Sequence, residues 1–384
     1  MNKKIAALIL FLTAGLSLAG CDVDTSTPTA AQPKTVKTYR IGVIAPMTGD
    51  AASYGVEVQR ALDYRLAEIN ANAKEEGYQI ALDYEDGKCE GAASALAFQK
   101  LTDIDGDKII LGGLCSSETL GFIQLLGDKG VLAVSEGSSN PDLEGMSPNF
   151  FSLSYSDSLV GANAAKELGK FSKVALISEQ NDYNEAMRKV VKKTLAEQFP
   201  QTTIVNDEVF PKGATDMRNL LAKINASDAE AVFLNPNAGI TGITLVKQLA
   251  EIQGWKKQLV SQVSLASPDT IKAAPTTLEG TIIIDAPSLQ SQDLKDYMKK
   301  ITDAKGPLTN LGVYYTASTL DSLNMLSTLA SRFDGDPMKM RDAIASEDFS
   351  GWIAPTFNFK GKSYVQGIQV ARYVITGGKS VLSN

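Results

Sequence analysis

Two pairs of adjacent serines, Ser116-Ser117 and Ser138-Ser139, are the residues of this chain best suited to bind a small polar molecule. Each pair follows a short apolar segment typical of a buried strand. Hydroxyl groups beside free backbone N–H groups form a seat for a carboxylate or a similar anionic group. Loops at the carboxyl ends of consecutive parallel strands are where open α/β sheets bind ligands. The alternative is that these serines only cap helices and line loops.

The first serine pair precedes an amphipathic segment, residues 119–126. This order predicts that Ser116 or Ser117 is the N-cap of a helix, with Glu118 or Thr119 completing a capping box.

The composition excludes several kinds of chemistry. The chain has no histidine, which rules out Ser-His-Asp and Cys-His nucleophiles and every His-ligated metal site. Paired carboxylates or a reactive lysine stay open, but no spacing of acids singles out such a pair. We therefore predict no catalytic residue, no cofactor and no metal. The net charge of −7, with basic residues scattered, does not favour nucleic acid as a partner.

The elements that position the serines alternate between strands and helices. Apolar strands are predicted at 39–45, 78–84 and 150–153, with amphipathic helices between them. A second round of alternation runs through 159–284. A chain of 384 residues suits two domains, so we predict an α/β fold with two doubly wound parallel sheets. The tail, 356–374, alternates around a Gly-Lys turn and predicts an antiparallel hairpin.

The N-terminus indicates export. Residues 1–20 have the basic start, apolar core and small residues of a signal peptide. Their end, Leu-Ala-Gly followed by Cys21, resembles a bacterial lipobox, which implies that Cys21 becomes a lipidated N-terminus. A plain secretory leader or a buried helix is the alternative. Residues 21–38 are poor in apolar side chains and are interpreted as a flexible tether.

Two further cysteines, Cys89 and Cys115, form an even pair in an exported protein. Both come just after predicted strands at the same edge of one sheet, which is compatible with a disulfide. A bridge closing a loop of this size stabilises the fold by roughly 3 kcal/mol on the loop-entropy model. A metal site built from two thiols is the weaker alternative.

Five sequence segments in order resemble the leucine/isoleucine/valine-binding branch of the type I periplasmic binding proteins, the solute receptors of ABC importers. They are IGVIAPMTGDAASYG, DYEDGKC, GGLCSS, SEGSSNPDL and VALISEQNDY. The resemblance implies two lobes joined by three crossovers that close on a ligand, and a bridge between Cys89 and Cys115. Lobe 1 is expected to combine residues 39–155 with 287–353, and lobe 2 residues 156–286 with 354–384.

The same resemblance assigns binding roles to individual residues. It implies that Ser116, Gly137, Ser138 and Ser139 hold the carboxylate and ammonium of an amino acid, with the Gly137 carbonyl accepting from the ammonium. Two aromatic residues are expected to flank the ligand, Tyr54 from lobe 1 and Tyr183 from lobe 2. Without the resemblance, packing within loops explains the two tyrosines equally well.

One departure from the family concerns the ammonium. Relatives that bind branched-chain amino acids place a glutamate after the strand at 258–260, where this chain has 261-SQVS-264. A second tyrosine of lobe 2 is replaced near 235-NPN-237. A buried ammonium without a counter-charge is costly. Either Glu136, Asp182 or Asp285 supplies the charge, or the solute is a carboxylate or amide without an ammonium.

These observations predict a lipid-anchored solute-binding protein of the cell envelope, monomeric and without enzymatic activity. It would deliver an amino acid-like solute to the permease of an ABC importer. A receptor of the same fold that reports to a membrane regulator is the alternative. An extracytoplasmic enzyme is a third reading, disfavoured because the chain has neither histidine nor a metal-ligand cluster.

Overall fold

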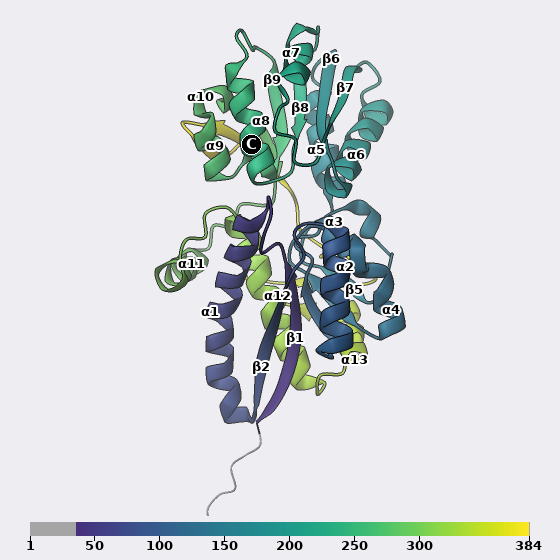
Figure 1. Cartoon of the computed structure of the whole chain (residues 1–384), viewed down its shortest axis with the longest axis vertical. Coiled ribbons are helices and arrows are strands. Elements are labelled where there is room, and N and C mark those ends of the chain that lie inside the picture. Colours follow the sequence, from purple (N-terminus) through teal and green to yellow (C-terminus); the bar gives the residue numbers. More distant parts are fainter. Residues whose placement is uncertain (1–35, 384) are drawn as a thin grey trace, which may run out of the picture. The chain divides into compact units, whose positions relative to one another are not determined.

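The computed structural model describes residues 36–383, so the predicted leader, Cys21 and nearly all of the tether lie outside the described residues. Within this part the chain forms two α/β lobes, each built on its own sheet (Figure 1). No helix of the described part combines the length and the apolar character needed to span a bilayer.

The sheet of the first lobe has five parallel strands in the order β2-β1-β3-β4-β5. The strands are β1 (Lys37–Ala45), β2 (Tyr78–Asp86), β3 (Ile109–Gly112), β4 (Leu132–Ser135) and β5 (Phe150–Ser152). Along β1, Ile41 and Val43 enter one apolar cluster, whereas Ile44 enters another. Alternate side chains of a strand point to opposite faces, so helices must cover both faces of this sheet.

Those helices come from both ends of the sequence. The first group is α1 (Ala52–Glu76), α2 (Gly91–Gln99) with the π-turn η1 (Lys100–Ile104), α3 (Ser116–Phe122) with the 3₁₀ turn η2 (Ile123–Leu125), and α4 (Leu126–Lys129). The second group is α11 (Gln292–Lys305), α12 (Gly312–Arg332) and α13 (Pro337–Ser346). Helix α1 packs on α11 and α12, and α2 packs on α3. The last short pieces of this lobe are η3 (Pro141–Leu143), β11 (Asp348–Phe349) and β12 (Phe357–Asn358).

The sheet of the second lobe has seven strands in the order β14-β13-β10-β9-β8-β6-β7. Five are parallel: β6 (Lys173–Gln180), β7 (Thr203–Pro211), β8 (Ala231–Asn235), β9 (Gln258–Gln262) and β10 (Ile282–Asp285). Two are antiparallel: β13 (Ala371–Thr376) and β14 (Lys379–Leu382). The helices are α5 (Asp157–Leu168), α6 (Asp182–Gln198), α7 (Arg218–Ala226), α8 (Ile240–Glu251), η4 (Val263–Leu265), α9 (Pro268–Ala273) and α10 (Pro275–Leu278). The predicted α/β class with two parallel sheets is confirmed.

The tail differs from the prediction. The hairpin is formed by β13 and β14 around a Gly-Gly turn at 377–378, not by residues 356–374. The segment 357–366 instead contacts the first lobe. The ring of Phe359 lies 5.2 Å from that of Phe151 on β5, and the Ser363 carbonyl accepts a hydrogen bond from the Ser152 N–H at the end of β5 (2.7 Å). The predicted boundary assigned this segment to the second lobe.

Candidate functional site

A cavity of about 100 Å³ lies between the loops that follow the parallel strands of the two lobes. The first lobe contributes Ala51, Tyr54, Cys89, Leu114, Cys115, Ser116, Ser117, Gly137, Ser139, Leu311 and Tyr315 to its wall. The second lobe contributes Asn181, Tyr183, Lys212, Asn237, Ala238, Val263 and Ser264. The wall contains one cationic side chain, that of Lys212, and no acidic one. It is mostly apolar, with a few hydroxyl and amide groups, as is usual for sites that bind small molecules.

Five of the six residues expected to bind a ligand line this cavity: Tyr54, Ser116, Gly137, Ser139 and Tyr183. Ser138 does not. Its hydroxyl donates to the Gly113 carbonyl (2.6 Å) and shares a hydrogen bond with Thr119, and its side chain is fully buried. Ser138 therefore holds the loop after β4 against the loop after β3, and its hydroxyl is used within the fold.

Ser116 joins the two serine-bearing loops. Its hydroxyl oxygen accepts from the backbone N–H groups of Ser139 (3.3 Å) and Asn140 (3.2 Å), and the residue is 2% exposed. Because both of these bonds use the lone pairs of the oxygen, the hydroxyl hydrogen stays available to donate. Ser116 therefore presents a hydrogen-bond donor at the cavity wall.

The cap of α3 is displaced by one residue from the prediction. Cys115, and not a serine, occupies the N-cap position, and Glu118, one of the two residues predicted to complete the capping box, is at N3. The Glu118 carboxylate accepts from the backbone N–H of Cys115 (3.0 Å) and from that of Cys89 (2.9 Å). Burial raises the pKa of Glu118 to about 7, although these two N–H groups act in the opposite direction.

Cys89 and Cys115 form a disulfide with a Cα–Cα distance of 5.3 Å, which confirms the predicted pairing. The bridge and Glu118 hold the loop after β2 to the start of α3. Among the described residues, no group of three or more His, Cys, Asp or Glu side chains could hold a metal ion.

The acids considered for an ammonium partner are not in the cavity wall. The carboxylate of Asp285 accepts from the Tyr155 hydroxyl (3.1 Å), and the Glu136 side chain is fully buried without lining the cavity. A residue that the sequence analysis did not consider, Asp157, lies directly behind the wall: the Ser139 hydroxyl donates to its carboxylate at 2.7 Å. Its one sequence signal was its position after β5, next to the helix cap Ser156.

Two aromatic wall residues are held by hydrogen bonds. The Tyr183 hydroxyl donates to Gln262 at the end of β9 (3.0 Å), and the Tyr315 hydroxyl shares a bond with that of Tyr155 (2.9 Å). Tyr315 and Leu311, at the start of α12, were missed by the sequence analysis because the helical pattern there indicates only an amphipathic helix.

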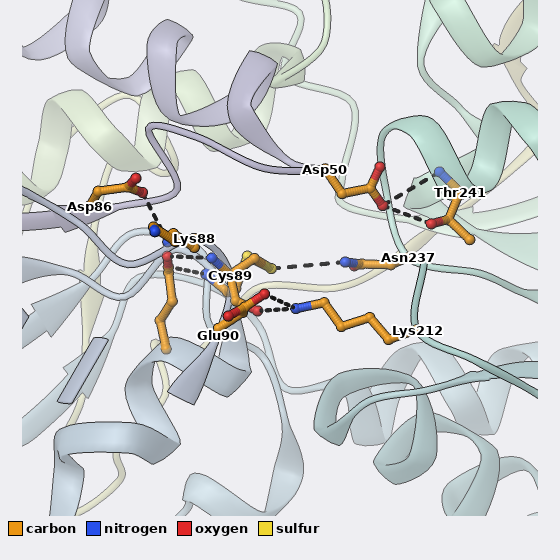
Figure 2. A network of polar contacts seen from close by, with 10 residues as sticks. Asp50, Asp86, Lys88, Cys89, Glu90, Lys212, Asn237 and Thr241 are labelled. Atoms are coloured by element: carbon orange, nitrogen blue, oxygen red, sulfur yellow. Dashed lines mark hydrogen bonds and ion pairs between the residues drawn. A yellow bond between two sulfur atoms is a disulfide. The ribbon is translucent and has the colours of Figure 1, made fainter. Parts of the chain in front are cut away.

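Hydrogen bonds cross from one lobe to the other beside the cavity (Figure 2). Thr241 donates its hydroxyl to Asp50 at 2.7 Å. Lys212 donates to the Cys89 carbonyl (3.1 Å) and to Glu90 (3.3 Å). The Asn237 amide lies 3.8 Å from the Cys89 sulfur. We refer to Asp50, Cys89, Glu90, Lys212, Asn237 and Thr241 as the interlobe latch.

Two α/β lobes with a cavity between their strand-end loops, and with contacts that cross from lobe to lobe, define a two-lobed ligand-binding protein. Residues 38–379 match the family model described as periplasmic binding protein. The chain belongs to this family. It is therefore a solute-binding protein and not an enzyme, and the family implies a location outside the cytoplasm.

The chain is also similar to individual proteins whose names are consistent with this family. The chain is 27% identical over 312 residues to a Leu/Ile/Val-binding protein homolog 2 of Brucella abortus, covering 79% of this chain and 81% of the relative. The fold is similar to that of a solute-binding protein of an ABC transporter from R. palustris, solved with 4-hydroxybenzoate (TM-score 0.78, 19% identity, 91% of this chain and 96% of the other). It is also similar to the branched-chain amino acid transporter substrate-binding protein LivJ of Streptococcus pneumoniae, solved with isoleucine (TM-score 0.76, 21% identity, 90% and 99%).

Proposed function

We propose that this chain is the solute-binding lipoprotein of an ABC importer and that it captures a small carboxylate-bearing solute in the cavity between its lobes. The solute class is a branched-chain amino acid or a related carboxylate or amide. The observation that carries the proposal is the hydroxyl of Ser116, held as a donor at the wall of a mostly apolar cavity.

The polar groups of the cavity wall suit a carboxylate. Ser116 presents a donor, Ser117 adds a hydroxyl, and Lys212 is the one charged side chain of the wall. Hydrogen bonds to an ionised acceptor are about twice as strong as those between neutral groups. A carboxylate placed here would gain such bonds without an acidic wall residue to repel it.

The remainder of the wall suits an apolar body. The same cavity is lined by the largely apolar side chains of Tyr54, Leu114, Tyr183, Val263 and Leu311. Burying an aliphatic or aromatic group of a solute against them stabilises the complex by about 0.8 kcal/mol for each methylene removed from water. This combination is consistent with the relatives, since one solved structure of the fold contains isoleucine and another contains 4-hydroxybenzoate.

Closure of the two lobes is the proposed mechanism. A solute that contacts both walls binds the closed form more tightly than the open form, and that difference in affinity shifts the population toward closure. The interlobe latch adds hydrogen bonds that exist only when the lobes are together. The closed lobes would then be the form recognised by the permease.

The leader supports attachment to the membrane. Cleavage before Cys21 would leave a lipidated N-terminus, and the tether up to residue 38 would hold the lobes away from the lipid surface. In cells fed a labelled fatty acid, the wild-type protein should take up the label and Cys21→Ser should not. Labelling of the variant would contradict the anchor.

A thermal-shift screen with amino acids, short amides and aromatic carboxylates tests the solute class, because a bound ligand raises the midpoint of unfolding. Ser116→Ala should then weaken binding of the selected solute by about 10- to 100-fold, the effect of one hydrogen bond to a charged group. Ser158→Ala, at an exposed position on α5, is the matched control. If no carboxylate raises the midpoint, the proposed solute class is wrong.

A further inference from the structure

Gln262, the last residue of β9, has a fully buried side chain behind the wall that the second lobe contributes to the cavity. Its carboxamide oxygen accepts from the Tyr183 hydroxyl (3.0 Å), from the Ser264 hydroxyl (3.0 Å) and from the Ser264 N–H (2.8 Å). Its amide nitrogen donates to the Pro236 carbonyl (3.0 Å) and to the Asn235 side chain (3.3 Å). Tyr183 and Ser264 line the cavity, whereas Gln262 does not. Gln262 therefore holds two wall residues from behind.

Backbone groups fix the direction in which the Gln262 carboxamide points. The Ser264 N–H can only donate, so the carboxamide atom beside it must be the oxygen. The Pro236 carbonyl can only accept, so the carboxamide atom beside it must be the nitrogen. A flipped carboxamide would lose both bonds, which leaves one orientation.

A second layer of amides supports this orientation. The Asn235 side-chain oxygen accepts from the Asn184 amide (2.8 Å), and the Asn235 amide donates to the Asn184 carbonyl (2.8 Å) and to the Ser178 hydroxyl (3.2 Å). These three residues are fully buried. A buried network whose members bond to one another favours a single arrangement of hydrogen bonds. The groups behind Tyr183 and Ser264 are therefore ordered, and they carry no charge.

The orientation of Gln262 decides the polarity of the two wall hydroxyls. An amide oxygen can only accept, so Tyr183 and Ser264 both direct their hydroxyl hydrogens toward it. In the part of the chain that the structure describes, neither hydroxyl oxygen accepts a hydrogen bond, so its lone pairs stay available to a solute. The second lobe therefore presents acceptors at these positions, whereas Ser116 of the first lobe presents a donor.

Two acceptors in a wall without acidic side chains suit a neutral donor on the solute. A buried ammonium without an anion in contact is costly, whereas a hydroxyl needs no counter-charge. A solute hydroxyl can donate to the Tyr183 or the Ser264 oxygen. An ether oxygen at the same place would meet lone pairs with no hydrogen between them and would lose its bonds to water.

We propose that Gln262 is a positioning residue of the solute site, which through Tyr183 and Ser264 favours carboxylates that also carry a hydroxyl over carboxylates that lack one. This inference rests on the proposed function and deepens it, since it names hydroxy acids as the solute class. Ser116 of the first lobe would bind the carboxylate, and the second lobe would bind the hydroxyl. Such a solute contacts both lobes and stabilises the closed form.

Matched probes separate donor, acceptor and apolar ends. Benzoate, 4-hydroxybenzoate and 4-methoxybenzoate share a ring and a carboxylate, and the corresponding 3-substituted acids present the same groups at another angle. Pentanoate, 5-hydroxypentanoate and 5-methoxypentanoate form an aliphatic series. In the series that binds, calorimetry should show that the wild type prefers the hydroxyl member over the unsubstituted acid by about 10-fold, and over the methoxy member by at least as much.

Substitutions of Gln262 test its role through this preference and not through affinity alone. Gln262→Leu removes the acceptor, so the Tyr183 and Ser264 hydroxyls become able to donate, and the preference for hydroxyl over methoxy should fall about 10-fold. Gln262→Glu retains an acceptor oxygen and should retain the preference, a rescue that a purely structural role does not predict. Gln258→Leu is the matched control, because Gln258 begins the same strand and bonds to Gly280 outside the cavity wall (2.9 Å).

Two wall variants carry the test if Gln262→Leu does not fold. Ser264→Ala and Tyr183→Phe each remove one acceptor and should weaken binding of the hydroxyl member by about 3- to 10-fold, with less than about a two-fold effect on the unsubstituted acid. In a folded Gln262→Leu background, Ser264→Ala should reduce the preference no further, so that the two changes are not additive.

Three results overturn the assignment. They are a preference that persists in Gln262→Leu, a preference that both wall variants leave intact, and a wild type that binds the unsubstituted or the methoxy acid as tightly as the hydroxy acid. A wild type that prefers 5-aminopentanoate over 5-hydroxypentanoate overturns the neutral donor. If no carboxylate of any series binds, the proposed function itself fails and this inference fails with it, which is a distinct result.

Discussion

Removing the interlobe latch should open the protein without unfolding either lobe. We expect the double variant Lys212→Met and Thr241→Val to lose the two side-chain bonds of Lys212 to the first lobe and the bond from the Thr241 hydroxyl to Asp50. None of these contacts exists within a single lobe. The change should therefore leave the stability of each lobe nearly unaltered and act on closure, together with the contact that the Lys212 side chain makes with the solute in the cavity wall.

The expected loss of affinity follows from how exposed the contacts of the interlobe latch are. The side chains of Lys212 and Glu90 are 33% and 53% exposed, so their ion pair contributes about 0.5 kcal/mol. The bond from Lys212 to the Cys89 carbonyl and that from Thr241 to Asp50 contribute about 1 kcal/mol each. Together the closed form should lose about 2.5 kcal/mol, which corresponds to about 70-fold weaker solute binding.

Two measurements test this prediction. Calorimetry gives the affinity for the solute selected by the screen, and small-angle scattering gives the radius of gyration with and without that solute. The variant should have a larger radius of gyration at a solute concentration that saturates the wild type. Lys223→Met is the matched control, since Lys223 forms a comparable surface pair with Glu208 inside the second lobe (2.6 Å). Thr241→Ser retains the hydroxyl and should bind nearly as the wild type does. An affinity within two-fold of the wild type, or an equal loss of stability without solute, would refute the reasoning.

Three further predictions concern stability. The double variant Cys89→Ser and Cys115→Ser opens a loop with a sequence separation of 26 and should lower the free energy of unfolding by about 3 kcal/mol. In urea titrations the wild type treated with a reductant should show the same loss. Burial raises the pKa of Glu136 to about 8, so wild-type stability should fall by about 4 kcal/mol as pH rises from about 5 to 8. Glu136→Gln lacks this ionisation and should be the more stable at pH 8 but not at pH 4. Gly55→Ala places a methyl group 2.2 Å from a backbone oxygen and should lower the melting midpoint by the equivalent of about 1–3 kcal/mol, whereas Gly127→Ala, which meets open space, should not.

The cap of α3 and the serine loops show how far local reasoning reaches. A capping box completed by Glu118 or Thr119 was predicted from the residue types at the helix start, and Glu118 completes it, which is a contact within one turn. The N-cap was misplaced by one residue, because Ser116 is held by Ser139 and Asn140 from another loop. Short-range patterns locate a helix end to within a residue. A hydrogen bond to a residue distant in the sequence decides which side chain is available to cap the helix.

The tail shows the same limit at a larger scale. Alternation over 356–374 predicted a hairpin, and the hairpin lies further on, at 371–382. Period-two alternation indicates an extended chain with one buried face, but it does not say which sheet covers that face. Phe357 and Phe359 are covered by the first lobe, which is a property of the assembled core.

The sequence by itself determined the α/β class with two parallel sheets, and it indicated the serine-bearing loops of the cavity wall, since these depend on periodicity and on residues at strand ends. It was compatible with a bridge between Cys89 and Cys115, and the structure places the two Cα atoms 5.3 Å apart in a disulfide. Only the tertiary structure decided that Ser138 faces inward while Ser139 reaches Asp157, and that Lys212 and Thr241 meet the opposite lobe. The physical reason is that the direction of a hydroxyl and the partner of a charged side chain depend on atoms brought close by folding. The residues next to it in the sequence do not determine which atoms those are.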